Sequence, residues 1–277
     1  MPPLIWCITR NRFDHPSLDD LMNHVPRKRF GQNFLRDDAV VHRIVSAVNP
    51  RQGDHLVEIG PGEGAMTNAF LKAGLPLDAV EIDRDLAAVL KRRLEASAHF
   101  RLHQADALKF DFHTLSQGEK LRIVGNLPYN ISTPLLFHLF AHAGIIEDMH
   151  FMLQKEVIDR LCAEAGDADY GRLGIMAQYY CRAEKLFEVS PESFYPPPKV
   201  TSAIVRLIPH TEPPVDTSSA ALGKVVATAF SQRRKTLRNA LKSLFNETQL
   251  CNAGIDPNAR AETLSLAQYA ALANQLT

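Results

Sequence analysis

Residues 55–64 read His55-Leu-Val-Glu-Ile-Gly-Pro-Gly-Glu-Gly64, and this stretch decides the fold. The short apolar run through Ile59 predicts a buried strand, and the glycines after it predict a tight turn into a helix. Glycine lets the backbone turn sharply and lets a ligand approach the main chain beside a helix N-terminus. A turn that merely links a strand to a helix would contain the same residues, so the stretch needs support from the rest of the chain.

Short apolar runs and helix-length segments alternate along the chain around this stretch. Strands are expected at 55–59, 77–82, 100–104, 121–124 and 149–153, with helical segments such as 84–96 and 133–143 between them. Near-continuous apolar strands that are separated by helices are typical of a parallel sheet covered on both faces. The sequence therefore predicts an α/β protein with a doubly wound, Rossmann-like sheet.

The chain changes character near its C-terminal quarter. A strand-like segment at 201–207 is followed by a proline-rich break at 209–214, after which apolar residues recur at helical spacing from Leu237 to Phe245. No strand of similar strength is expected beyond the break. We expect a main domain at 22–208 and a small all-helical domain at 209–277. Residues 1–21 are expected to be an extension, either a dispensable tail or a segment upstream of a natural start at Met22.

Composition excludes several classes of protein. The 277 residues carry 31 basic and 31 acidic side chains and are 45% hydrophobic, so the chain is neither disordered nor polybasic overall. The four cysteines lie far apart and have no zinc-site spacing, so we expect no disulfide framework and no metal site. No apolar run approaches the roughly 18 to 20 residues of a membrane span. We therefore expect a cytoplasmic protein with reduced thiols and no membrane partner.

Carboxylates follow two of the predicted strands at the same edge of the sheet as the glycine turn. The second strand ends in Glu81-Ile82-Asp83, and Asp106-Ala107 comes just after the third. Side chains at these places are suited to accept hydrogen bonds from ribose hydroxyls and from the amino group of an adenine. A helix N-cap role would explain any one of these acids by itself. Because Gly60-x-Gly62-x-x-Ala65 also satisfies the dinucleotide pattern, NAD and S-adenosylmethionine both remain open as cofactors at this point.

The fourth strand ends in a second group of residues with a chemical interpretation, Asn126-Leu127-Pro128-Tyr129. The lone pair on adenine N6 is conjugated into the ring, so N6 attacks a methyl group poorly until acceptors draw its hydrogens out of the ring plane. The side-chain oxygen of Asn126 and the carbonyl of Leu127 are suitable acceptors, and they would stabilise the positive charge that develops on N6. Tyr129 would stack on the extruded base, and Pro128 would fix the backbone. A turn that simply ends a strand is the competing interpretation.

With these residues in place, the sequence resembles the KsgA/RsmA-type adenine-N6,N6-dimethyltransferases of small-subunit (16S) ribosomal RNA from about Arg27 to Tyr269. Related enzymes of the large-subunit RNA share the methyl-transfer motifs, but the segments at Met152 and Phe230 resemble the small-subunit branch. Residues 1–21 lie outside the family pattern. The motifs that carry the resemblance are Arg27-Lys-Arg-Phe-Gly-Gln-Asn-Phe-Leu35, Val57-Glu-Ile-Gly-Pro-Gly62, Glu81-Ile-Asp83, Gly125-Asn-Leu-Pro-Tyr-Asn-Ile-Ser-Thr-Pro134, Met152-Leu-Gln-Lys-Glu156, Phe194-Tyr-Pro-Pro-Pro-Lys-Val200 and Phe230-Ser-Gln-Arg-Arg-Lys-Thr-Leu-Arg238.

The resemblance implies a Rossmann-like methyltransferase that uses S-adenosylmethionine and releases S-adenosylhomocysteine. It implies that Phe194 stacks on the target adenine opposite Tyr129, although from the residues alone Phe194 would be a core aromatic before a proline turn. The catalytic residues would be Asn126, Leu127, Pro128, Tyr129 and Phe194. The cofactor-binding residues would be Gln32, Asn33, Leu35, Gly60, Gly62, Glu81, Ile82, Asp106, Ala107 and Asn126.

By the same resemblance, the substrate is a pair of adjacent adenosines in the hairpin loop near the 3′ end of 16S rRNA, each dimethylated. The enzyme would act as a monomer on the 30S particle and take part in ribosome biogenesis. Basic residues cluster just before the segment that contains Gln32, Asn33 and Leu35, and again at 224–242. No acid lies among the basic residues of 224–242, and phosphate contacts require clusters of this kind. The residues expected to bind RNA are Arg27, Lys28, Arg29, Lys199, Arg233, Arg234, Lys235 and Arg238.

Three competing interpretations of the sequence remain. A solvated helix face would account for the basic run without RNA. An NAD-dependent oxidoreductase would share the glycine turn but would have no use for the residues from Asn126 to Tyr129. A ribosome-assembly factor could keep the methyltransferase fold as a scaffold without catalysis, although Asn126 and Glu81 argue against a pure scaffold.

Overall fold

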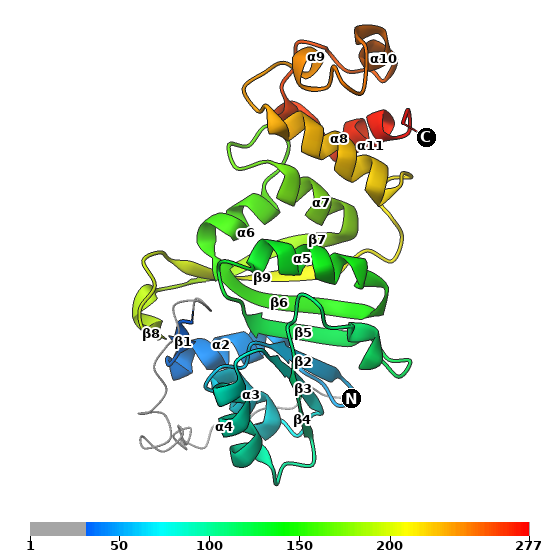
Figure 1. The fold of residues 1–277 in the computed structure, drawn as a ribbon. Helices are drawn as coiled ribbons and strands as arrows, with labels where there is room; N and C mark the ends of the chain where they lie inside the picture. The colour runs from blue at the N-terminus through cyan, green and yellow to red at the C-terminus, as the bar shows by residue number, and fades with distance from the viewer. Residues whose placement is uncertain (1–31, 277) are drawn as a thin grey trace.

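One mixed sheet of seven strands organises residues 32–276, the part of the chain that a computed structural model describes (Figure 1). Its strand order is β4-β3-β2-β5-β6-β9-β7. Strands β2 to β6 pair in parallel, whereas β9 runs antiparallel to both of its neighbours. The strands are β2 (His55–Ile59), β3 (Leu77–Glu81), β4 (Phe100–Gln104), β5 (Leu121–Asn126), β6 (Ile146–Gln154), β7 (Cys181–Val189) and β9 (Ser202–Pro209).

A separate two-stranded sheet joins segments that are far apart in the sequence. Strand β1 (Phe34–Leu35) pairs antiparallel with β8 (Phe194–Tyr195), so that Phe34 faces Tyr195 and Leu35 faces Phe194. The pairing continues beyond the strands, because the Arg36 N–H donates to the Ser193 carbonyl at 2.9 Å. This small sheet therefore holds the segment before α2 (Asp38–Val48) against the segment before β9.

Helices cover both faces of the large sheet and continue beyond it toward the C-terminus (Figure 1). They are α2 (Asp38–Val48), α3 (Ala65–Lys72), α4 (Arg84–Leu94), α5 (Ser132–Ala141), α6 (Lys155–Cys162), α7 (Arg172–Tyr180), α8 (Ser219–Ser231), α9 (Leu237–Ala240), α10 (Glu247–Asn252) and α11 (Leu266–Ala273). Within residues 32–276, none of these helices is long and apolar enough to cross a membrane.

Two apolar clusters, one on each face, explain why the residues of the central strands β2 and β3 are buried throughout. All five residues of β2 are buried, with Val57 and Ile59 in the cluster that contains α5 and α6. Leu56 points to the opposite face and packs with α2, α3 and the small sheet. Side chains alternate between the faces of a strand, so covering both faces buries every position.

A third apolar cluster forms the C-terminal part of the molecule. It joins α8, α9, α10 and α11 to α7, with Leu222, Leu241 and Tyr269 fully buried. Tyr170 and Met176, which precede the proline-rich break, belong to the same cluster. The C-terminal helices therefore pack on α7, at the end of the molecule far from β4 (Figure 1).

The α/β fold predicted from the sequence is confirmed. The strands at 55–59 and 100–104 have the expected bounds and pair in parallel with β3, whereas the strand-like segment at 201–207 lies in β9, which is antiparallel to its neighbours. Strand β7 was not predicted, since polar residues interrupt its apolar pattern. The helical spacing from Leu237 to Phe245 produces an α-helix only as far as Ala240, and the chain then continues in turns.

Candidate functional site

A cavity opens where β2, β3, β4 and β5 end. It encloses roughly 950 Å³, counting the part that is open to solvent, and is walled by the segment around β1 and by the loop that follows each of these strands. Carboxyl ends of parallel strands meet at one edge of a sheet, which is why loops distant in sequence converge there. Its lining, mostly apolar with a few polar groups that converge on one space, is typical of a site for a small-molecule ligand.

The structure brings most of the predicted site residues together in this wall. The cavity is lined by every residue expected to bind the cofactor and by four of the five expected catalytic residues: Gln32, Asn33, Leu35, Gly60, Gly62, Glu81, Ile82, Asp106, Ala107, Asn126, Leu127, Pro128 and Tyr129.

The glycine loop is held open by its backbone conformation and by Glu81. Gly60 and Gly62 have φ of 69° and 57°, in the left-handed region that favours glycine. A Cβ on Gly62 would also lie 3.1 Å from the ring of Phe34. Oε2 of Glu81 accepts the Gly62 N–H at 3.2 Å, and Oε1 accepts the Asp83 N–H at 2.9 Å. The loop therefore leaves its main chain close to the cavity.

The two acids at the strand ends keep acceptor capacity toward the cavity. Burial raises the pKa of Glu81, although the N–H groups of Asp83 and Gly62 oppose that shift. Each carboxylate oxygen has two lone pairs, so Glu81 can accept further hydrogen bonds. Asp106 uses Oδ1 to accept the Leu108 N–H at 3.0 Å. This local turn bond leaves acceptor capacity on the carboxylate of Asp106, which lines the cavity.

Asn126 ends β5 with its amide in a defined orientation. Its Nδ2 donates to the carbonyl oxygen of Asn33 at 2.9 Å, which makes the side-chain oxygen the acceptor that remains. Gly125 allows the close approach of β5 to β2, because a Cβ there would come within 2.6 Å of the Ile59 carbonyl oxygen. Sequence reasoning missed Asn33 as the partner of Asn126, since the two residues lie on different segments.

Tyr129 is fixed by a contact that the sequence did not suggest. Its hydroxyl hydrogen-bonds to Oγ of Ser202, the first residue of β9, at 2.7 Å. Burial raises the pKa of Tyr129, so its side chain stays a neutral phenol at neutral pH. Ser202 has a weak sequence signal, being a polar residue that begins an apolar strand shortly after the motif ending at Val200.

Phe194 lies beside the cavity and not in its wall. The ring is only 4% exposed and packs in the apolar cluster with Leu35, its partner across the small sheet. Leu35 itself lines the cavity. Phe194 therefore packs in the core and pairs with a residue of the cavity wall.

Glu58 is a cavity residue that sequence reasoning did not single out. This β2 residue is fully buried, and its Oε2 accepts a hydrogen bond from the Thr67 hydroxyl at 2.6 Å. Burial raises the pKa of Glu58 to about 7. The available signal was an acid within an otherwise apolar strand.

The basic residues predicted to bind RNA either are absent from the cavity lining or lie outside the described residues. Arg27, Lys28 and Arg29 are among the latter. Lys199 is exposed on the loop between β8 and β9. The other four, Arg233, Arg234, Lys235 and Arg238, are exposed around the turn between α8 and α9.

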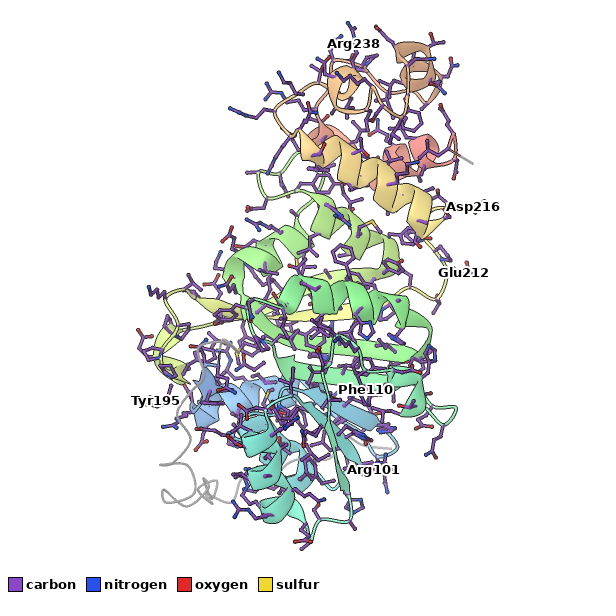
Figure 2. The ribbon with its side chains drawn as sticks, viewed as in Figure 1. Arg101, Phe110, Tyr195, Glu212, Asp216 and Arg238 are labelled. Carbon is purple, nitrogen blue, oxygen red and sulfur yellow. The ribbon has the colours of Figure 1, made fainter. Side chains whose placement is uncertain are left out.

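Two of these four basic residues have partners. Arg233 Nη2 donates to the Ala168 carbonyl at 2.5 Å, and Arg238 pairs with Glu247 at 2.8 Å. Figure 2 shows Arg238 among the C-terminal helices, well away from Tyr195 beside β8. Within 32–276, no group of three or more His, Cys, Asp or Glu side chains is arranged to hold a metal.

Comparison with known proteins shows which protein family has a sequence of this kind. The family model described as "Ribosomal RNA adenine dimethylase" matches residues 23–277. The chain is 62% identical over 255 residues to Ribosomal RNA small subunit methyltransferase A of Methylococcus capsulatus, covering 92% of this chain and 99% of that protein. The protein of the same name from Pseudomonas aeruginosa is 57% identical over 261 residues, covering 94% and 97%.

Solved structures agree with this similarity. A dimethyladenosine transferase from Plasmodium falciparum superposes with a TM-score of 0.70 at 25% identity, covering 86% of this chain and 95% of that one. The 23S rRNA methyltransferase ErmE superposes with a TM-score of 0.66 at 27% identity, covering 88% and 99%. The chain belongs to the ribosomal RNA adenine dimethylase family.

Proposed function

We propose that the protein transfers methyl groups from S-adenosylmethionine to N6 of two adjacent adenosines in the 3′-terminal hairpin loop of 16S rRNA within the 30S particle, dimethylating each. One observation carries the proposal. The cavity that joins the glycine loop and the acids Glu81 and Asp106 is continuous with the segment from Asn126 to Tyr129. A nucleoside-binding wall and a set of acceptors for an adenine amino group thus share one space.

The residues of the cavity fit S-adenosylmethionine. Glu81 has acceptor capacity for ribose hydroxyls, and the backbone at Gly60 and Gly62 permits close approach of a ligand. Asp106 and Ala107 are proposed to hold the adenine, while Gln32, Asn33 and Leu35 cover the methionine end. When bound, this cofactor supplies an electrophilic methyl group.

The catalytic work of the chain is to orient the target amine. The Asn33 carbonyl turns the amide of Asn126 so that its side-chain oxygen can accept one N6 hydrogen. The Leu127 carbonyl would accept the other, and together they stabilise the positive charge that grows on N6. N6 becomes acidic as it gains the methyl group and loses its proton to solvent, so no ionised base is needed. Positioning and electrostatics supply most of the rate enhancement.

Two aromatic rings are proposed to hold the adenine that has left its stack. Tyr129 is anchored through Ser202 and presents its ring to the cavity. Phe194 would face it from the β8 side once RNA is bound. Stacking between aromatic rings is the usual way in which an extruded base is held.

We also propose that residues 22–208 form the catalytic domain and residues 209–277 a helical domain, with RNA phosphates held at Lys199 and at the α8–α9 turn. The basic run before β1, from Arg27 to Arg29, is proposed to help. Both parts act in the cytoplasm on the 30S particle, and the enzyme works as a monomer.

The test is the transfer of labelled methyl groups from S-adenosylmethionine to unmethylated 30S particles, with the labelled nucleosides mapped. We expect label as N6,N6-dimethyladenosine in the 3′-terminal hairpin of 16S rRNA, and no label with Asn126→Ala. Label at another site would overturn the proposed substrate. Tight particle binding without any transfer would favour the assembly-factor alternative.

A further inference from the structure

An exposed aromatic side chain stands next to the proposed base pocket. Tyr195 is 52% exposed and Val200 43%, and the loop that joins them also carries the exposed Lys199. Figure 2 shows Tyr195 at the outer edge of the molecule, beside β8. Single exposed apolar side chains need no explanation, but a ring and an aliphatic side chain grouped beside a functional cavity indicate a contact surface.

The Tyr195 ring is held in place from one side. The guanidinium of Arg36 lies 4.4 Å from the ring centroid. The same guanidinium pairs with Glu63, with Nη2 to Oε1 at 3.0 Å and Nε to Oε2 at 3.3 Å. Glu63 lines the cavity. The Arg36 guanidinium thus links the Tyr195 ring to Glu63 of the glycine loop. The exposed face of the ring is therefore held in one orientation before any ligand binds.

The charge around this ring favours an anionic partner with flat groups. Arg36 keeps a side chain that is 44% exposed, and Lys199 is exposed with no ion pair to any acid within 32–276. Sites for single-stranded nucleic acid combine aromatic rings, on which bases stack, with cations that follow the backbone. An unpaired RNA base is therefore the occupant that fits.

Position decides which base this would be. Phe194 precedes Tyr195 directly, and consecutive Cα atoms lie about 3.8 Å apart. Across the small sheet Tyr195 faces Phe34, which lines the cavity. Successive residues of a strand point to opposite faces, so the exposed Tyr195 ring lies on the outer face of β8, where the nucleotide next to a base held at Phe194 would remain on the surface.

We propose that Tyr195, braced by Arg36, is the stacking platform for the unpaired base that adjoins the target adenosine. This inference rests on the proposed function. The neighbouring nucleotide would be held on the Tyr195 ring at the surface while the target adenosine occupies the pocket. The Tyr195 ring would therefore contribute to RNA binding and not to methyl transfer.

The test compares Tyr195→Ala, Tyr195→Phe and Lys199→Ala in the full-length chain, with unmethylated 30S particles as substrate. Tyr195→Ala should raise KM for particles roughly 5- to 100-fold, as loss of one stacked base does, with kcat changed less than about 2-fold. Tyr195→Phe keeps the ring and should restore KM to near the unsubstituted value. Calorimetry should give the same Kd for S-adenosylmethionine in all of these proteins.

Salt dependence separates stacking from charge. Lys199→Ala should lower the slope of log affinity against log salt by roughly one, whereas Tyr195→Ala should leave that slope unchanged. An unchanged KM in Tyr195→Ala, or a Tyr195→Phe variant as impaired as the alanine variant, would overturn the platform. Weaker binding of S-adenosylmethionine would mean that Tyr195 acts through Arg36 and Glu63. Failure of the unsubstituted chain to methylate particles would instead overturn the proposed function.

Discussion

Phe194 combines a packing role with its proposed role at the target base. The side chain is almost completely buried and contributes to the cluster that also contains Leu35 and α2. Truncation to alanine would therefore remove core packing, at a cost of about 3 to 5 kcal/mol in the free energy of unfolding, together with the ring. A leucine keeps much of the volume and removes the aromatic face.

We expect Phe194→Leu to lower kcat for methyl transfer roughly 5- to 100-fold while the Kd for S-adenosylmethionine stays within about 2-fold, because the ring touches the base and not the donor. Phe112→Leu is the matched control, since it makes the same change in a fully buried ring of the other sheet face. Steady-state kinetics and cofactor titration measure both quantities. Equal losses of turnover and cofactor affinity would contradict the assignment of Phe194.

Glu58 makes stability depend on pH in the neutral range. Its folded pKa of about 7 lies above the ordinary value of 4.5, so the fold favours the protonated carboxyl. The contribution to stability is complete below pH 4.5 and is lost as the pH rises through 7.

Glu58→Gln replaces the carboxyl by an amide that cannot titrate. Relative to the variant, the unsubstituted protein should lose about 3 kcal/mol of unfolding free energy between pH 4.5 and pH 8. Urea unfolding of both proteins at pH 5, 6.5 and 8 measures the difference. Parallel pH profiles would show that Glu58 stays charged in the folded protein.

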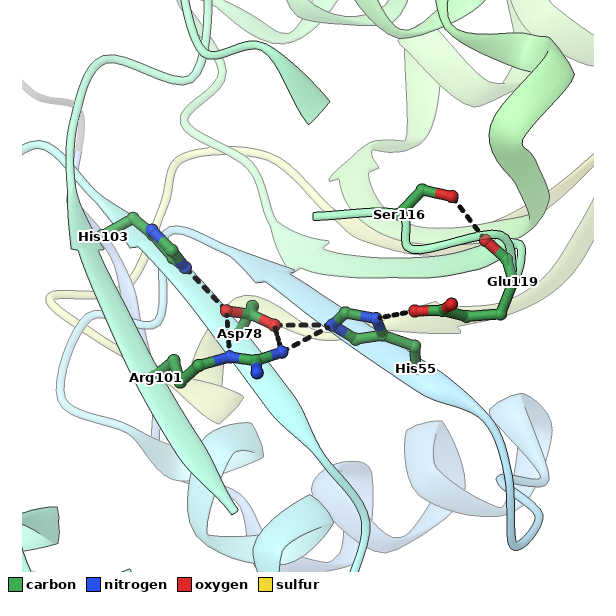
Figure 3. A network of polar contacts seen from close by, with 6 residues as sticks. All are labelled: His55, Asp78, Arg101, His103, Ser116 and Glu119. Atoms are coloured by element: carbon green, nitrogen blue, oxygen red, sulfur yellow. Dashed lines mark hydrogen bonds and ion pairs between the residues drawn. The ribbon is translucent and has the colours of Figure 1, made fainter. Parts of the chain in front are cut away.

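At the scale of elements, a charge network centred on the buried Asp78 ties together three strands at the sheet edge opposite the cavity (Figure 3). Asp78 of β3 is fully buried and pairs with His55 of β2 at 2.5 Å and with His103 of β4 at 2.6 Å. Arg101, also in β4, pairs with Asp78 at 2.7 Å. Glu119, from the loop before β5, pairs with His55 at 2.8 Å.

The network also makes the stability of the fold depend on pH. Burial by itself would raise the pKa of Asp78, but the bonds from His103, His55 and Arg101 outweigh burial and lower it. The bond to Asp78 raises the pKa of His55 above 6.5. The Asp78 contribution is present above pH 3.8 and is lost on acidification, whereas the His55 contribution is complete below pH 6.5 and is lost as the pH rises.

Asp78→Asn should destabilise the protein by about 3 to 5 kcal/mol at pH 6, because it leaves cations without their buried partner. The penalty should be smaller at pH 9 than at pH 6, because the His55 contribution is lost as the pH rises. Glu212→Gln changes the same charge on an exposed residue of the proline-rich break and should have little effect. Thermal unfolding of both proteins at pH 6 and pH 9 tests this prediction. A loss of stability that is the same at both pH values would show that the ion pair between Asp78 and His55 does not cause it.

The sequence predicted those elements whose physical cause is local. Strand β2 is covered on both faces, so its apolar run was visible and its bounds were predicted correctly. Strand β7 is an edge strand with exposed Glu184 and Lys185, so no such run existed. The direction of β9 depends on which strand it pairs with, and pairing is a property of the whole sheet.

The same distinction holds for the candidate site. Residues within motifs, such as Gly60 and Asn126, were found because each motif is contiguous in the sequence. Ser202 and Asn33 were missed as partners of Tyr129 and Asn126, because their roles come from contacts between distant segments. From the residues alone Phe194 was expected to be a core aromatic, and it is buried, but its pairing with Leu35 of the cavity wall could not be deduced from its neighbours.

For the whole molecule, the basic turn between α8 and α9 lies at the opposite end from the loops after β3 and β4 (Figure 1). Arg234 and Lys235 are exposed there, and neither pairs with an acid of residues 32–276. The helices that carry the turn share their apolar cluster with α7, which contacts the sheet through β7. A particle bound at the turn can therefore be held in a fixed relation to the cavity.

The double variant Arg234→Ala, Lys235→Ala should weaken binding to 30S particles and lower the salt slope by roughly two, because two phosphate contacts are lost. The control is Lys91→Ala, Arg92→Ala, which removes the same charge from exposed residues near the end of α4. Filter binding between low and moderate salt measures both slopes. Equal effects of the two double variants would indicate attraction by net charge and not by this turn.

The small sheet of β1 and β8 has a consequence for the order in which the enzyme becomes complete during its own synthesis. Phe34 and Leu35 leave the ribosome early, but Phe194 and Tyr195, with which they pair, follow only after most of the large sheet has been made. Pairing between distant segments forms late, because a long loop of chain must close first. The wall of the cavity next to the glycine loop is therefore completed only after β8 has been made, and a nascent chain cannot close the cavity until then.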